Sequence, residues 1–149
     1  MLDAPYKLSE GLCLERSSVL LPWFLSLHQI TKLGGNPLPP KGKATQLFWD
    51  SETVFGGLHM AVQAMAYGSG IFYLTRKKDR SFNSAQEEYA SVLVELKDRF
   101  GKSHKSGETD GYPWARWHWG DVCLNIAIGE RFVDYVVLSV SKGVIENDL

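Results

Sequence analysis

Hydrophobic residues along this chain recur with two periods, one typical of helices and one typical of strands. The helical period is clearest over residues 85–100, where apolar side chains fall on one face and charged side chains on the other. Ser84 and Glu87 have the spacing of a capping box, and Gly101 supplies the left-handed residue that commonly ends a helix. The sequence therefore predicts an amphipathic helix with one face packed and the other in water.

A first helix is predicted over residues 23–33. Its apolar stripe is shorter, and Pro22 falls in its first turn, where the missing amide hydrogen costs little. Gly34 and Gly35 end this helix. Upstream, residues 11–19 alternate weakly and predict a short edge strand.

Three strands are predicted after each helix, because short alternating runs are separated by turns that contain glycine. The segments between helix and strands, residues 36–44 and 102–112, are interpreted as loops. The pattern predicts one α+β domain over residues 1–149, with two helices, a largely antiparallel sheet and an α-β-β-β pseudo-repeat. Whether the two halves share an ancestor stays open. The expected strands are residues 45–49, 58–67, 71–77, 114–119, 122–128 and 135–141.

Composition restricts the partners and the compartment. The chain has 149 residues, 44% of them hydrophobic, and a formal net charge of -1, without the basic surplus typical of nucleic-acid-binding domains. Its longest apolar stretch, residues 19–27, is interrupted by Pro22 and Ser26 and is shorter than the ~20 residues of a membrane span. Residues 1–12 lack the basic-then-apolar order of a secretory signal. We therefore expect a cytoplasmic protein that binds neither nucleic acid nor a membrane.

The strongest candidate for a binding site is the aromatic strand near residue 117. Trp117 and Trp119 share one face of this strand, and Arg116 and His118 share the other. One interpretation is a platform that presents aromatic rings and a guanidinium to a ligand, with Trp114, Arg116 and His118 as the binding residues. The preferred interpretation places Trp117 and Trp119 in the core and leaves Arg116 and His118 on the solvent face.

Other candidate chemistry has less support. His118 and Cys123 are expected on adjacent strands, but Cys123 lacks the cationic surroundings or helix terminus that activate a thiol. Both cysteines, Cys13 included, are interpreted as buried thiols, and the four histidines are scattered, so we expect no disulfide, metal or cofactor. The basic run at residues 76–80 is interpreted as a solvated strand end, and no enzymatic activity is expected. Carboxylates near predicted turns are interpreted as caps or solvated groups, and nothing selects two of them as an acid pair of the glycosidase type. They are Asp50, Glu52, Asp121, Glu130 and Asp134.

The spacing of several segments resembles that of small bacterial immunity proteins, which accompany secreted or contact-delivered toxins. The resemblance rests on residues 21–23, a short helix, residues 35–37, the helix at residues 89–101 and the strands at residues 117–140. It implies one-to-one binding to a cognate toxin and inhibition by covering the toxin's active site. It transfers no functional residues. The near-neutral charge departs from the strongly acidic inhibitors of basic nucleases, so a wall-degrading or other toxin fits equally well.

Two alternatives remain beside the toxin inhibitor. The first is a small-molecule-binding domain, with a ligand between the sheet and the helices against Trp49, Trp117 or Trp119. The second is a homodimer, because two half-repeats that each end in a sheet edge leave strands that can pair between copies.

Overall fold

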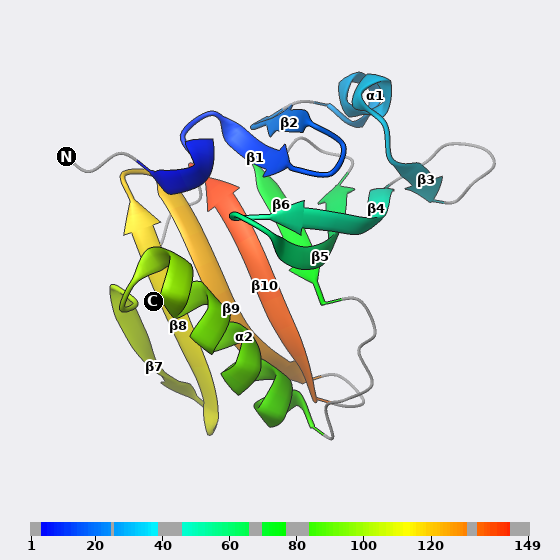
Figure 1. Cartoon of the computed structure of the whole chain (residues 1–149). Coiled ribbons are helices and arrows are strands. Elements are labelled where there is room, and N and C mark those ends of the chain that lie inside the picture. Colours follow the sequence, from blue (N-terminus) through cyan, green and yellow to red (C-terminus); the bar gives the residue numbers. More distant parts are fainter. Residues whose placement is uncertain are drawn as a thin grey trace.

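A large antiparallel sheet dominates the computed structural model, which describes residues 4–24, 26–38, 46–65, 70–76, 84–130 and 134–143. One long helix, α2 (Ala85–Phe100), lies across the half of the sheet formed by β8 to β10, and a small N-terminal unit lies at the other end (Figure 1). The expected α+β class with a mostly antiparallel sheet is confirmed. Among the described helices, none is long and apolar enough to cross a membrane.

The eight strands follow the order β3-β4-β5-β6-β10-β9-β8-β7, so each half of the chain contributes four consecutive strands. The two halves meet where β6 pairs antiparallel with β10. The strands are β3 (Asn36–Leu38), β4 (Gln46–Val54), β5 (Leu58–Met65), β6 (Ile71–Thr75), β7 (Lys105–Thr109), β8 (Tyr112–Trp119), β9 (Val122–Glu130) and β10 (Asp134–Lys142).

The expected pseudo-repeat therefore has four strands in each half instead of three. Strands β3 and β7 lie in segments that the sequence predicted as loops, and both are the outermost strands of the sheet. Their sequences, Asn-Pro-Leu and Lys-Ser-Gly-Glu-Thr, carry no apolar alternation, because an outermost strand buries little of either face. The prediction of loops at these two segments was wrong for this reason.

The hydrophobic core lies between the inner face of the sheet and the elements that cover it. Trp117 is fully buried there, its indole N–H donates to the Gly101 carbonyl over 2.9 Å, and its ring contacts Phe100. Helix α2 buries Tyr89, Val92 and Leu96 against the same face. The placement of Trp117 in the core is thus confirmed.

Helix α2 has the boundaries that its sequence predicted. The Ser84 hydroxyl accepts a hydrogen bond from the Glu87 backbone N–H over 3.1 Å, and Gly101 follows the last turn with a φ of 78°. Two side chains tie the helix to the first half of the sheet. Arg99 donates to the Phe55 carbonyl over 2.7 Å, and Glu95 pairs with Arg76 at 2.7 Å.

The N-terminal unit consists of a hairpin followed by short helical turns. Pro22 is the last residue of β2, and Phe24 has a φ of 65°, which a helix does not tolerate. The helix predicted over residues 23–33 is therefore present only from Leu27 to Leu33, as two short turns, and the prediction was wrong for its first residues. The expected strand over residues 11–19 is two strands paired with each other. The elements are η1 (Pro5–Lys7), β1 (Gly11–Leu14), β2 (Val19–Pro22), α1 (Leu27–Ile30) and η2 (Thr31–Leu33).

A buried carboxylate fastens this unit to the sheet. Glu52 is only 3% exposed, beside an irregularity in the pairing of β4 with β5. It accepts hydrogen bonds from the Arg16 backbone N–H, the Ser17 hydroxyl and the Thr53 backbone N–H. Glu52 was expected near a turn and lies inside β4 instead, where it binds the turn between β1 and β2.

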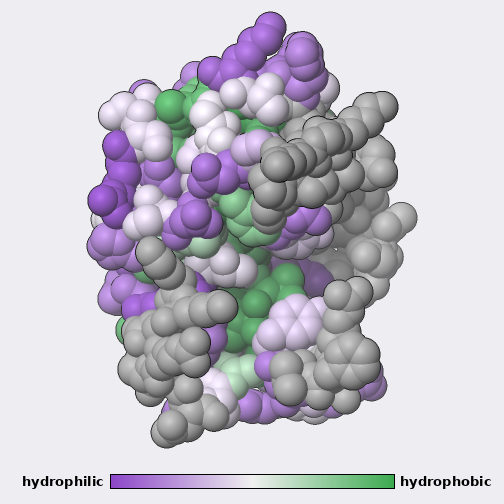
Figure 2. Space-filling view, turned by 90° about the vertical axis from the view of Figure 1, so that its right-hand side faces the viewer, coloured by the Kyte–Doolittle hydropathy of each residue, from purple (hydrophilic) through white to green (hydrophobic). Residues whose placement is uncertain are grey.

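On the side of β3 and β4, many of the coloured residues in Figure 2 are hydrophilic. Figure 2 shows this side, where apolar side chains gather mainly in a hollow at its lower centre. The outer face of the sheet, opposite α2, is only partly exposed, and its register aligns a row of residues across all eight strands. That row is Lys105, Arg116, Asn125, Ser139, Tyr73, Gln63, Phe48 and Asn36.

Candidate binding site on the outer face of the sheet

Strand β8 separates the two groups of side chains that the sequence singled out. Ala115 and Trp117 point into the core, whereas Trp114, Arg116 and His118 lie on the outer face and are half-buried. The separation follows from the period of two in a strand. The expected division of faces is therefore observed, although the outer side chains are less exposed than a solvent face implies.

Trp114 and Arg116 form a stacked pair. The guanidinium carbon of Arg116 lies 4.5 Å from the centre of the Trp114 ring, and its Nε donates to Asn125 Oδ1 over 2.8 Å. Nη1 is shielded from water and has no hydrogen-bond partner among the described residues. A guanidinium held in one orientation in this way is suited to a contact with a carboxylate or a phosphate.

Gly107 on β7 allows the Trp114 ring to lie flat against the neighbouring strand. Gly107 is paired with Trp114 in the register, and a Cβ at this position would lie 2.8 Å from the indole ring. The φ of Gly107 is not in the left-handed region, so the ring and not the backbone requires glycine here. Sequence reasoning missed Gly107 because β7 was interpreted as a loop.

A pocket of about 280 Å³ opens beside this pair at the turn between β7 and β8. Tyr112 forms part of its wall, and its hydroxyl donates to Asp134 Oδ1 over 3.0 Å, which ties the end of β8 to β10. The pocket is smaller than most sites for drug-sized ligands, and suits one side chain or a small ion. It is lined by Thr109, Asp110, Tyr112, Pro113, Trp114, Arg116, Ala127 and Ile128.

His118 lies next along the same face and directly opposite Cys123 of β9, as the sequence predicted. The His118 backbone N–H donates to Nδ1 of His104 over 2.8 Å, and the His104 ring contacts Trp119 at 5.8 Å. Cys123 is 6% exposed and lies within the sheet. His118 therefore borders the stacked pair and anchors the segment before β7.

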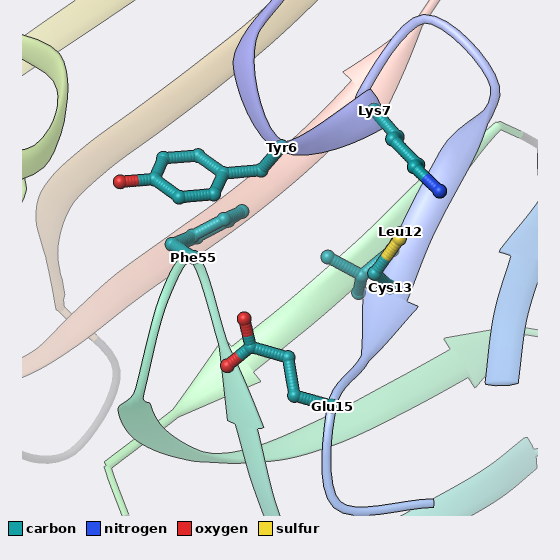
Figure 3. Close-up of a pocket in the computed structure, with 6 residues that line it drawn as sticks. All are labelled: Tyr6, Lys7, Leu12, Cys13, Glu15 and Phe55. Carbon is teal, nitrogen blue, oxygen red and sulfur yellow. The ribbon is translucent and has the colours of Figure 1, made fainter. Parts of the chain in front are cut away.

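A second, smaller pocket lies between the N-terminal unit and the β4–β5 turn (Figure 3). It measures about 160 Å³, with the rings of Tyr6 and Phe55 on one side and Lys7 and Cys13 on the other. Burial raises the pKa of the Cys13 thiol, although Lys7 lowers it in part, so the thiol stays protonated near neutral pH. Glu15 accepts from the N–H groups of Gly56 and Gly57 and so holds the turn in place.

A shallow groove of about 400 Å³ runs between α2 and the β7–β8 edge. Leu93, Pro113 and Ala115 form an apolar floor, and Lys97 and Glu108 lie at its rim. Trp49 and Trp117, which the sequence offered as ligand-binding rings, are buried in the core instead. A ligand between sheet and helix would therefore lie in this groove and not against those two rings.

Metal ligands do not gather in the described part of the chain, where no group of three or more His, Cys, Asp or Glu side chains could hold an ion. Of the basic run at residues 76–80, only Arg76 is described, and it pairs with Glu95. No protein-family model matches the sequence, and comparison with curated proteins and with solved structures finds no match.

Proposed function

We propose that this protein acts in the cytoplasm by binding a partner protein through the outer face around Trp114, Arg116 and His118, and that the partner is a bacterial toxin that it inhibits. The observation that carries the proposal is the stacked Trp114–Arg116 pair, which Asn125 orients while Nη1 remains without a hydrogen-bond partner among the described residues. The immunity-protein resemblance in the sequence supplies the toxin as the partner.

Tryptophan and arginine are the residues most often found at the energetic centre of protein interfaces. Here the guanidinium already has its stacking partner and one hydrogen bond, so binding needs little further ordering of this side chain. Half-burial of both residues lets a partner complete the exclusion of water from them. We expect truncation of either side chain to weaken binding by about 2 kcal/mol, or roughly thirtyfold.

The electrostatics of the pair select an acidic contact on the partner. Arg116 has no ion pair among the described residues, whereas Arg76 pairs with Glu95. A carboxylate of the toxin near Arg116 would complement the charge of the guanidinium. The formal charge of -1 carries no general attraction to a basic enzyme, so the contact is local.

The test is co-purification of the tagged chain with candidate toxins encoded beside its gene, followed by titration of the toxin's activity. We expect a stoichiometric complex whose formation abolishes that activity. Arg116→Ala should weaken binding roughly thirtyfold, while Lys32→Ala, an exposed cation on η2, should leave affinity unchanged. A complex that forms equally well with Arg116→Ala, or a partner whose activity persists when bound, refutes the proposal.

The groove beside α2 favours a second candidate function, the binding of a small molecule. Its apolar floor and charged rim have the composition of a ligand site, although it is shallow. Native mass spectrometry of protein purified from its own organism, combined with a thermal-shift panel, tests this function. A bound compound displaced by Leu93→Trp, which would fill the floor, supports it; protein that carries no compound and shows no stabilisation argues against it.

A further inference from the structure

The two outermost strands of the sheet differ in their capacity to accept another strand. At one end, β3 has three residues and includes Pro37, which has no N–H to donate. At the other end, β7 has five residues without proline, and within the described chain it pairs only with β8. Proteins commonly protect their sheet edges with proline, short strands and charged side chains. β7 has no proline, and its charged residues, Lys105 and Glu108, restrict which strands can pair with it.

We propose that β7 pairs with an extended segment of the partner protein, in which apolar side chains alternate with acidic ones. The inference rests on the proposed function and specifies how the partner docks. Backbone pairing supplies affinity in such strand addition, and alternate side chains supply specificity. Figure 1 shows β7 at the margin of the sheet with α2 beside it, so the added strand would lie along an open side.

The inner face of the added strand would meet the groove between β7 and α2. Ser106 and Glu108 of β7 border this groove, and Leu93 lies in its floor. Every second side chain of a strand points to the same face, so successive inward side chains would enter the groove from its open side. The apolar floor favours aliphatic side chains at these positions.

The outer face of the added strand would meet two cations. Lys105 of β7 is directly opposite Arg116 of β8, and neither has an ion pair among the described residues. Like charges opposite each other across a strand pair repel, so an acidic side chain beside Lys105 relieves this repulsion. Between the cations and the β7–β8 turn, Gly107 lies against the Trp114 ring and places no side chain beside it.

Both faces therefore specify the same alternation in the partner. An extended segment about as long as β7 would span roughly 17 Å and place inward aliphatic groups beside outward carboxylates. The groove requires the aliphatic groups, and the Lys105–Arg116 pair requires the carboxylates. The proposed occupant is thus a strand of the toxin and not a small ligand.

The experiment uses a short blocked peptide that repeats Val-Glu, added to the isotope-labelled full chain up to about 2 mM, with affinity measured from backbone amide shifts in NMR spectra. We expect shifts in β7, in the α2 residues of the groove and at the Trp114 indole N–H. A peptide that repeats Val-Lys is the matched control and should bind at least about tenfold more weakly. Equal binding of the two peptides, or the absence of shifts in β7, overturns the proposal.

Two sets of variants separate strand pairing from charge. Lys105→Glu should reverse the preference between the two peptides, whereas Lys102→Glu, an exposed lysine before β7, should not. Along an antiparallel strand the N–H groups point alternately toward the neighbour and away. Proline is therefore placed at two neighbouring positions, in the variants Ser106→Pro and Gly107→Pro. The variant that loses an N–H directed to the open edge should keep the native spectrum and no longer bind the peptide. Peptide binding by both variants overturns the proposal.

The two proposals fail in different ways. If the toxin complex depends on Arg116 but survives the folded proline variant, the proposed function stands and strand addition is wrong. If peptide binding follows the predicted pattern but no toxin complex forms, strand addition at β7 is supported and the proposed toxin partner is wrong. Concentration-dependent dimerisation through β7, seen by light scattering and lost in the same proline variant, would show that a second copy occupies the edge and would overturn the proposed partner.

Discussion

Replacing Glu52 should weaken the attachment of the N-terminal hairpin to the sheet and so destabilise the fold. The carboxylate is 3% exposed and accepts three hydrogen bonds, two of them from backbone N–H groups. The N–H groups of Arg16 and Thr53 both donate to Oε1, and the Ser17 hydroxyl donates to Oε2. Glu52→Ala removes all three acceptors, whereas Glu52→Gln keeps the amide oxygen for the two backbone donors.

The expected loss of stability depends on how many of the three hydrogen bonds each variant removes. Hydrogen bonds to charged groups are each worth about 1.5–3 kcal/mol when buried. Arg16 and Ser17 lie on an exposed loop, so water can replace part of what Glu52→Ala removes. We therefore expect Glu52→Ala to lower the free energy of unfolding by about 3 kcal/mol, and Glu52→Gln by roughly 1 kcal/mol.

Urea denaturation followed by far-ultraviolet circular dichroism measures both values. A loss of about 3 kcal/mol corresponds to a fall in Tm of about 10 °C for a domain of this size. Asp50→Ala, at an exposed position on the same strand, is the matched control and should stay within about 0.5 kcal/mol of the wild type. The reasoning is refuted if Glu52→Ala also stays within that range, or if Glu52→Gln is as damaging as Glu52→Ala.

Three further predictions follow from contacts elsewhere. Gly35→Ala should lower the free energy of unfolding by about 2–4 kcal/mol, because the new Cβ would lie 2.8 Å from the Trp49 ring. Gly57→Ala is the control in the same urea titration: its φ is also positive, but no atom lies near the new Cβ, so the loss should be only about 1 kcal/mol. Gly107→Ala should move the Trp114 ring, seen as a shift of its indole N–H signal and about tenfold weaker partner binding; an unchanged indole signal contradicts the assigned contact. In a Cys123→Ser background, iodoacetamide should alkylate Cys13 more slowly than free cysteine at pH 8, because partial burial raises the pKa of the Cys13 thiol. The alkylation rate should rise only beyond pH ~8.5, and a midpoint of the rate below pH ~8.5 contradicts this raised pKa.

Helix α2 could be predicted from sequence because its signals are local. A cap at Ser84, a stripe of apolar side chains and a terminal glycine all lie within one element, and the structure begins and ends it at the expected residues. The central strands β4, β5, β6, β8, β9 and β10 share this property, because each buries one face and so alternates. The division of faces in β8, with Trp117 inward and Arg116 outward, follows from the same local rule.

The sequence alone therefore determined the fold class, the main helix, the six inner strands and the two faces of the aromatic strand, all of which depend on neighbours within a few residues. Tertiary structure decided what depends on distant pairs. The helix expected at residues 23–33 begins only at Leu27, because Phe24 has a positive φ, and β7 became a strand only because β8 supplies its hydrogen bonds. The Trp114–Arg116 pair likewise required Asn125 from β9 and Gly107 from β7, because a side chain's orientation is fixed by whatever packs against it, and local sequence does not name those partners.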